Sequence, residues 1–202
     1  MFTKITNKIF GLVLGNLLVL GIILTSFTIY FTYKNGEKDI EELDKTLRQD
    51  FDTNAKNEVE TAISLLQAVY NKYQNGEYSL EDAKKAGADL VRVLSYGNEG
   101  YFWIDTKDGT NIVLLGRDTE GKNRYESLDS KGSPFIKTLI SNGLKEGGGF
   151  TDYWFSKKGG GDPLPKRGYT LYFKPFEWIV GTGNYIDDID RIISEKKVTN
   201  KK

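Results

Sequence analysis

An uninterrupted apolar segment near the N-terminus limits the folds open to this chain more than any other feature. Residues 9–33 run for 25 positions without a charged side chain and are rich in Leu, Ile, Val and Phe. A bilayer core requires about 20 apolar residues, whereas the apolar region of a cleaved signal peptide has about 7–15. The length therefore predicts a transmembrane signal anchor over residues 9–33 rather than a cleaved signal peptide.

The charges that flank this segment predict its orientation. Lys4 and Lys8 precede it, and residues 34–39 carry charges of both signs. Because Lys and Arg are enriched on the cytoplasmic side of membrane spans, residues 1–8 are predicted to form a cytoplasmic N-terminus. Everything that follows the anchor is then predicted to lie outside the cell membrane.

The composition excludes several chemistries. The chain contains neither His nor Cys, and its 28 Lys and Arg balance its 28 Asp and Glu. A thiol nucleophile, a zinc finger and a His-ligated haem are therefore excluded. A balanced charge also gives no basic face for nucleic acid. We expect no cofactor, no metal site and no nucleic-acid partner.

A helical period follows the apolar segment. Over residues 40–73 apolar side chains recur every three or four positions, which is typical of one long amphipathic helix. This helix either continues the transmembrane helix as a rod that transmits motion, or serves as a stalk or as the backing of a sheet. Further on, Ser79 and Asp82 resemble a capping box and predict a second helix through Leu90 and Leu94.

Short aromatic and β-branched runs replace the helical period in the second half of the chain. They predict five strands, at Tyr101–Asp105, Asn111–Leu115, Phe150–Phe155, Gly168–Lys174 and Trp178–Tyr185. Asp108-Gly109 predicts a hairpin between the first two strands. The fold class is predicted to be α+β, with the long helix backing a five-stranded antiparallel sheet.

Three further segments complete the predicted fold. Residues 116–132 have no apolar period and predict a long loop, which in a compact domain is usually functional. Ser133 as N-cap, Pro134 in the first turn and Gly143 past the end predict a short helix. Asp187 opens a last helix, where negative charge suits the helix dipole.

Three motifs resemble the single Cache domain of bacterial chemoreceptors. They are Tyr96-Gly97-Asn98-Glu99-Gly100-Tyr101-Phe102-Trp103-Ile104, Pro165-Lys166-Arg167-Gly168-Tyr169 and the run from Trp178 to Asp190. The resemblance covers about residues 37–197 and implies a PAS-like extracytoplasmic sensor domain of methyl-accepting chemotaxis proteins and sensor kinases. It also implies binding of small organic acids and signalling through the membrane. We place this domain at residues 34–197.

The chain departs from the family pattern at two places. Many relatives carry a His-Pro step after the second strand, where this chain reads Leu114-Leu115-Gly116-Arg117-Asp118. Arg117 either replaces the His as a bidentate donor to a carboxylate or pairs with Asp118 and Glu120. The second departure is the end of the sequence: residues 198–202 either lead to a missing second transmembrane span and signalling module, or end an anchored sensor.

Strand alternation predicts which aromatic side chains face a pocket. Tyr101, Trp103 and Asp105 share one face of their strand, and Phe102 and Ile104 share the other, which should back onto the long helix. Tyr101 and Trp103 pair an apolar body with a polar handle, so they either line a pocket or are core aromatics with satisfied polar ends.

Glycines and cations complete the predicted pocket. Gly181 and Gly183 leave a groove without side chains, for a packed helix or for a ligand. Cations beside tyrosines favour an anion, such as a carboxylate of two to four carbons, although these cations are equally consistent with solvated surface residues. The predicted ligand-binding residues are Tyr101, Trp103, Arg117, Tyr153, Lys166, Arg167 and Tyr169.

The sequence leaves three functions open. The leading hypothesis is a non-enzymatic sensor whose pocket binds a small carboxylate and shifts the last helix relative to the rod. The first alternative is a hydrolase or transferase that uses scattered carboxylates such as Asp105, Asp108 and Asp118. The other is an anchored binding or adhesion module, which an exposed Tyr/Trp platform would favour.

The expected partners are a small molecule, the membrane and a second copy of the chain. Gly11 and Gly15 form a Gly-x-x-x-Gly pair within the apolar segment. Such a pair either lets two membrane helices approach closely or reflects the general frequency of Gly in membrane spans. A homodimer is predicted, whose cytoplasmic signalling module is not part of this chain.

Overall fold

The computed structural model describes residues 2–97 and 99–199, with side chains from Ile5 onward. Contacts divide the chain into two units, one of Met1–Thr46 with Arg191–Lys202 and one of Leu47–Asp190. Among the sequence predictions, Asn98 of the first motif and the last three residues of the 198–202 segment lie outside the described residues.

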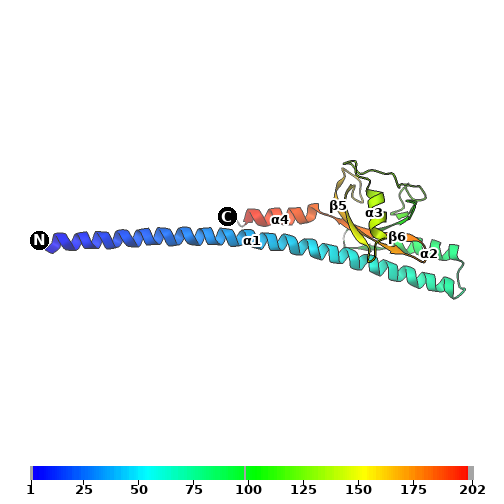
Figure 1. Ribbon diagram of the computed structural model, residues 1–202, viewed down its shortest axis with the longest axis horizontal. Coiled ribbons are helices and arrows are strands. Elements are labelled where there is room, and N and C mark those ends of the chain that lie inside the picture. The colour runs from blue at the N-terminus through cyan, green and yellow to red at the C-terminus, as the bar shows by residue number, and fades with distance from the viewer. Residues whose placement is uncertain (1, 98, 200–202) are drawn as a thin grey trace. The chain divides into compact units, whose positions relative to one another are not determined.

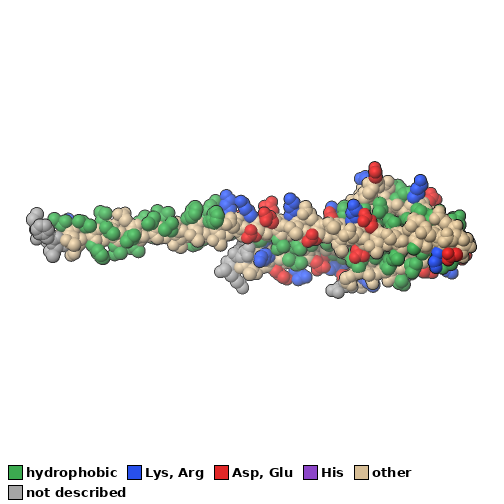
Figure 2. Space-filling view, turned by 90° about the horizontal axis from the view of Figure 1, so that it is seen from below, with side chains coloured by type: hydrophobic (Ala, Val, Ile, Leu, Met, Phe, Trp, Pro, Cys, Tyr) green, Lys and Arg blue, Asp and Glu red, His purple; other side chains and the backbone are tan. Residues whose placement is uncertain are grey.

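The unit that contains the N-terminus is helical. Helix α1 (Phe2–Gln74) runs through the apolar segment and the amphipathic segment without a break, so the helix predicted over residues 40–73 continues the apolar helix. Apolar side chains over residues 9–33 are exposed, and hydrophobic side chains gather along this part of α1 in Figure 2. By length and composition, with a mean hydropathy of 2.3 in its most apolar stretch, the helix is able to cross a membrane. Helix α4 (Asp187–Thr199) contributes its later residues to the same unit.

An antiparallel sheet forms the centre of the unit Leu47–Asp190. Its strands are β1 (Ser95–Tyr96), β2 (Gly100–Thr106), β3 (Asn111–Leu114), β4 (Gly149–Phe155), β5 (Leu164–Phe173) and β6 (Trp178–Tyr185). The order is β1-β2-β6-β5-β4, and β3 also pairs with β2. The five predicted strands are confirmed. Two features were not predicted: the short β1, and the start of β5 at Leu164, which pairs with Phe155.

Helices cover the two faces of this sheet. The later part of α1 and α2 (Leu80–Val93) pack on one face, and α3 (Phe135–Gly143) packs on the other (Figure 1). Val59 and Leu66 of α1 share a core cluster with Phe102 and Ile104 of β2. The prediction that the apolar pair of β2 backs onto the long helix is confirmed.

Local signals account for the start of α2 and for the hairpin. Ser79 caps α2, because its Oγ accepts a bond from Asp82 N at 3.0 Å. In the β2–β3 hairpin, Gly109 adopts a φ of +89°, which side chains disfavour. Both predictions are confirmed.

The predicted cap of α3 was wrong by one residue. Pro134 occupies the N-cap position, and Gly143 is the last helical residue instead of lying beyond the end. Ser133 is unavailable as a cap because its backbone belongs to the preceding turn. Its N–H donates to Asp129 Oδ1 and its carbonyl accepts from Asp129 N, both at 2.9 Å.

Candidate ligand-binding site

The sheet face under α3 collects the aromatic side chains that strand alternation assigns to it. Tyr101 and Trp103 of β2 and Tyr153 of β4 belong to one buried cluster with Ile136 and Leu139 of α3. Tyr101 and Trp103 are only 1% and 2% exposed. The alternation along β2 is therefore confirmed, and it places both residues inside the fold.

Lys166 lies at the centre of these rings. This residue of β5 is fully buried, and its Nζ donates to Tyr101 Oη at 2.7 Å. Four ring centroids lie within 5.6 Å of Nζ: those of Tyr101, Trp103, Tyr185 and Phe155. Lys166 forms no ion pair among the described residues. A buried lysine amine without a carboxylate partner marks a candidate anion-binding site, because an isolated buried charge is strongly disfavoured.

Burial lowers the pKa of Lys166 well below its usual value, and the nearby positive charges of Arg117 and Arg124 lower it further. Burial raises the pKa of Tyr101 and Tyr153. The phenols therefore stay neutral and are able to donate hydrogen bonds to an anion.

A second polar group in the site lacks a partner. Trp103 Nε1 is buried and forms no hydrogen bond among the described residues. Its ring lies over Gly181, where a Cβ atom would come within 2.5 Å of the indole carbons. The space that Gly181 leaves is therefore filled by Trp103, and neither a helix nor a free groove occupies it. A Cβ at Gly183 would meet the backbone of Arg167 instead.

An ion pair that the sequence did not indicate closes the site on one side. Arg124 donates to both oxygens of Asp105, from Nε at 2.8 Å and from Nη2 at 2.6 Å. Asn111 donates to the same carboxylate at 3.0 Å. Strand alternation already placed Asp105 on this face, and a buried carboxylate requires a cationic partner. Nothing in the sequence indicated that this partner is Arg124 of the long loop.

The cavity between these side chains is small. It measures about 10 Å³ and is lined by Tyr101, Trp103, Leu114, Arg124, Phe135, Leu139, Tyr153 and Phe155. Such a space holds about one water molecule. A carboxylic acid of two or more carbons therefore enters only when the surrounding side chains move apart.

Arg117 lies at the edge of this cluster. Its guanidinium lies over the ring of Phe155 at 5.4 Å and donates to the Lys157 carbonyl at 3.3 Å. The alternative pairing with Glu120 is not found, because that carboxylate bonds to Arg92 and to backbone N–H groups. Arg117 is therefore held close to Lys166 without an acidic partner among the described residues.

The structure separates Arg167 and Tyr169 from Lys166. Both lie on the opposite face of β5, because side chains alternate along a strand. Arg167 binds Asp52 of α1 and Asp152 of β4, and Tyr169 donates to the Gly147 carbonyl at 2.5 Å. Of the seven predicted residues, the structure brings together Tyr101, Trp103, Tyr153 and Lys166, with Arg117 nearby.

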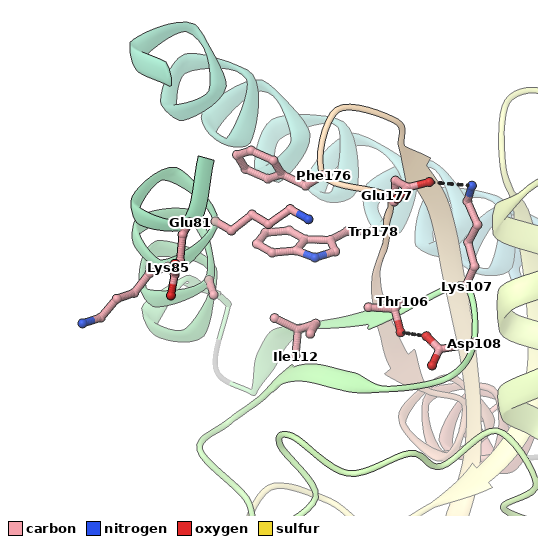
Figure 3. A pocket seen from close by; sticks show the side chains of 11 residues that line it. Glu81, Lys85, Thr106, Lys107, Asp108, Ile112, Phe176, Glu177 and Trp178 are labelled. Atoms are coloured by element: carbon pink, nitrogen blue, oxygen red, sulfur yellow. Dashed lines mark hydrogen bonds and ion pairs between the residues drawn. The ribbon is translucent and has the colours of Figure 1, made fainter. Parts of the chain in front are cut away.

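A larger groove lies away from this cluster. It measures about 570 Å³ and lies between α2, the β2–β3 turn and the β5–β6 turn (Figure 3). Its charged rim is partly paired with itself, since Lys107 binds Glu177 at 3.2 Å and Asp108 accepts from Thr106. No buried polar group without a partner faces it among the described residues. Size alone therefore favours this groove, whereas the chemistry favours the site at Lys166.

Comparison with known proteins identifies the family. The sequence profile of Single Cache domain 2 matches residues 47–197. The chain belongs to the Single Cache domain 2 family. The resemblance inferred from the three motifs is thereby confirmed, and the unit that contains Lys166 is a Cache sensor domain.

Two curated relatives of this Cache chain are signalling proteins. The sensor histidine kinase MctS of Rhizobium johnstonii is 27% identical over 184 residues, which cover 91% of this chain and 39% of the relative. The methyl-accepting chemotaxis protein McpP of Pseudomonas putida is 28% identical over 133 residues, covering 65% and 24%. The chain thus spans well under half the length of these relatives.

Solved Cache domains share the fold. A methyl-accepting chemotaxis protein from Vibrio parahaemolyticus superimposes with a TM-score of 0.67 at 25% identity, covering 75% of this chain and 99% of that one. A Cache chemosensory domain described for its carboxylic acid recognition gives 0.67 at 24% identity, covering 71% and 98%. The α+β Cache fold, with its long N-terminal helix and antiparallel sheet, is therefore shown.

Proposed function

We propose that this Cache domain is a sensor that binds a short carboxylate at Lys166, without catalysis. The observation that carries the proposal is the fully buried amino group of Lys166, which has no acidic partner among the described residues. A carboxylate between Lys166 Nζ, Tyr101 Oη and Trp103 Nε1 would form charge-assisted bonds and satisfy the indole donor. The apolar side chains around the cavity would take its carbon end.

Enclosure distinguishes this proposal from an adhesion module. Adhesion through stacking requires aromatic rings on the surface, whereas Tyr101 and Trp103 are almost completely buried. The solved Cache domain described for carboxylic acid recognition shares the fold and agrees with the proposed ligand class. The proposal itself rests on Lys166 and Trp103.

The test is a thermal-shift screen of the full chain in nanodiscs. A ligand that binds only the native state raises the melting temperature by mass action. We expect a rise with acetate, propionate, butyrate or succinate, and none with matched amines or sugars. A panel in which no carboxylate raises the melting temperature, or in which amines do, would contradict the proposal.

We further propose that residues 9–33 anchor the chain in the cell membrane, with residues 1–8 in the cytoplasm and residues 34–197 outside. Binding is relayed across the membrane by α1 and α4 in a homodimer, to a signalling module such as those of the relatives. The apolar surface of α1 and the basic residue Lys8 support the topology.

Topology is measurable because the chain contains no Cys. Single variants Asn7→Cys and Lys158→Cys, probed in intact cells with a membrane-impermeant maleimide, should give labelling only at position 158. Labelling at position 7, or equal labelling of both, would contradict the proposed orientation.

A further inference from the structure

The neighbourhood of Lys166 specifies how a ligand is bound as well as where. The rings of Tyr101, Trp103, Phe155 and Tyr185 surround Nζ. Cation–π contacts offset part of the cost of moving an ammonium ion out of water, but the rings carry no net charge and supply no counter-ion. Rings alone therefore do not keep the amine charged in the empty site.

The titratable groups around Lys166 do not provide a counter-ion for its amine. These groups are Tyr101 and Asp105 from β2, Arg117 and Arg124 from the loop after β3, Tyr153 from β4, Tyr185 from β6, and Glu99 with the Lys157–Asp187 pair beyond Tyr185. α3 contributes the apolar side chains of Phe135, Ile136, Leu139 and Ile140 to this cluster. Of these carboxylates, Asp105 is bound by Arg124 and Asn111, and Asp187 is paired with Lys157.

Tyr101 accommodates the amine in either protonation state. Lys166 Nζ and Tyr101 Oη lie 2.7 Å apart. A charged amine donates to the phenol oxygen across this distance, and a neutral amine is able to accept a hydrogen bond from the phenol O–H on its lone pair. Without a ligand, the site is therefore able to hold a neutral lysine that keeps its hydrogen bond to Tyr101.

We propose that the carboxylate binds together with one proton, because Lys166 is a neutral amine in the empty site and becomes an ammonium ion when the carboxylate arrives. This inference rests on the proposed function. The proton comes from the solvent, since a carboxylic acid with a pKa near that of Glu, about 4.3, is already ionised at neutral pH. One N–H bond forms at Nζ, and the charge of the ligand is balanced inside the site. The depressed pKa of Lys166 agrees with this step.

Proton uptake makes the affinity depend on pH. Over the range in which the empty site is neutral and the occupied site is charged, one proton is bound per ligand. The dissociation constant then rises about tenfold for each unit of increasing pH. The domain would thus respond most strongly to a carboxylate in mildly acidic surroundings.

Isothermal titration calorimetry of the full chain in nanodiscs tests the inference with acetate, propionate and butyrate. Titrations at pH 7.5 in HEPES and in Tris differ in the heat of buffer ionisation. We expect the measured enthalpy to change with the buffer as uptake of about one proton per ligand requires. We also expect the dissociation constant to rise about tenfold per pH unit between pH 6.5 and 8.5.

Two variants assign the proton to Lys166. Lys166→Arg carries a permanent charge, so any binding it retains should show no proton uptake. Lys174→Met, at an exposed lysine just after β5, should behave as the wild type. Binding with the same enthalpy in both buffers, or uptake that persists in Lys166→Arg, would overturn the inference and leave the proposed function intact. If none of the three acids binds to the wild type, both the proton uptake and the proposed function are overturned.

Discussion

Lys166 and Arg167 are consecutive in β5, and their charged groups lie on opposite faces of the sheet. Lys166 Nζ donates to Tyr101 Oη at 2.7 Å on the site face. Arg167 donates from Nε and Nη2 to the two oxygens of Asp52 in α1, at 2.7 and 2.9 Å. Two adjacent residues therefore connect the candidate site to the long helix. A displacement of β5 on ligand binding would reach α1 through this pair.

The Arg167–Asp52 pair should be worth measurable stability. It is bidentate and each side chain is about two-thirds buried, so we expect Asp52→Asn to destabilise the domain by about 1 kcal/mol. This corresponds to a fall of about 2–4 °C in melting temperature. Asp152→Asn is the matched control, since Asp152 is 61% exposed, and should change the melting temperature less. An equal fall in melting temperature for the two variants would show that the Arg167–Asp52 pair stabilises the domain no more than the exposed Arg167–Asp152 pair does.

Lys166→Met should stabilise the empty domain while it removes ligand binding. The substitution replaces a buried amine without an ion-pair partner by an apolar side chain of similar length. Differential scanning calorimetry should show a higher melting temperature than the wild type, and added carboxylate should no longer raise it. A variant that melts lower than the wild type and still responds to carboxylate would contradict the role given to this lysine.

The indole N–H of Trp103 should report the ligand directly. It is buried without a partner, so a carboxylate that accepts its bond should shift its resonance downfield in a ¹H–¹⁵N spectrum of the full chain. Trp103→Phe identifies the signal and should weaken binding by roughly tenfold to a hundredfold, the range of one hydrogen bond to a charged group. The half-buried Trp154, on the other face of β4, serves as the control through Trp154→Phe. A ligand that shifts only the Trp154 signal would place the site elsewhere.

Gly181→Ala should displace the indole of Trp103 in the candidate site. The new methyl group would lie 2.5 Å from the indole of Trp103, and overpacking of this kind costs about 1–3 kcal/mol. We therefore expect lower stability and weaker carboxylate binding. Gly159→Ala adds a methyl group with nothing within 4 Å, and its melting temperature should stay within about 1 °C of the wild type.

The ionised carboxylate of Glu120 should stabilise the domain, and this contribution should be lost in acid. Burial opposes ionisation, but the N–H groups of Leu114 and Gly116 and the Arg92 guanidinium outweigh it and lower the pKa of this carboxyl below its usual value of 4.5. A depressed pKa contributes stability that is complete above the unfolded value and is lost as the pH falls through the folded value. Glu120→Gln should melt below the wild type at pH 7, and the difference should shrink from about pH 5 downward. A difference that is constant with pH would exclude this linkage.

Much of the fold could be predicted from periodicity and turn chemistry. The positions of Val59 and Leu66 on one helical face, and the alternation of Phe102 and Trp103, each reflect a local rule that tertiary contacts did not override. The cap of α3 was missed because Asp129 engages the backbone of Ser133, a contact that helix signals do not encode.

The candidate site was only partly predictable. Alternation identified Tyr101 and Trp103, but grouping Lys166 with Arg167 ignored the same rule on β5, where neighbours face opposite sides. Arg124 comes from a loop without periodicity, so its contact with Asp105 depends on a chain path that no local pattern specifies. The burial of Lys166 likewise depends on rings from several strands.

Whether a short carboxylate binds at Lys166 can be measured by calorimetric titration of the wild type, Lys166→Met and Lys174→Met with acetate, propionate and butyrate at pH 6.5. We expect saturable binding of at least one acid to the wild type and to Lys174→Met, and no heat of binding to Lys166→Met at the same concentrations. Undiminished binding to Lys166→Met, or no binding to the wild type, would contradict this expectation.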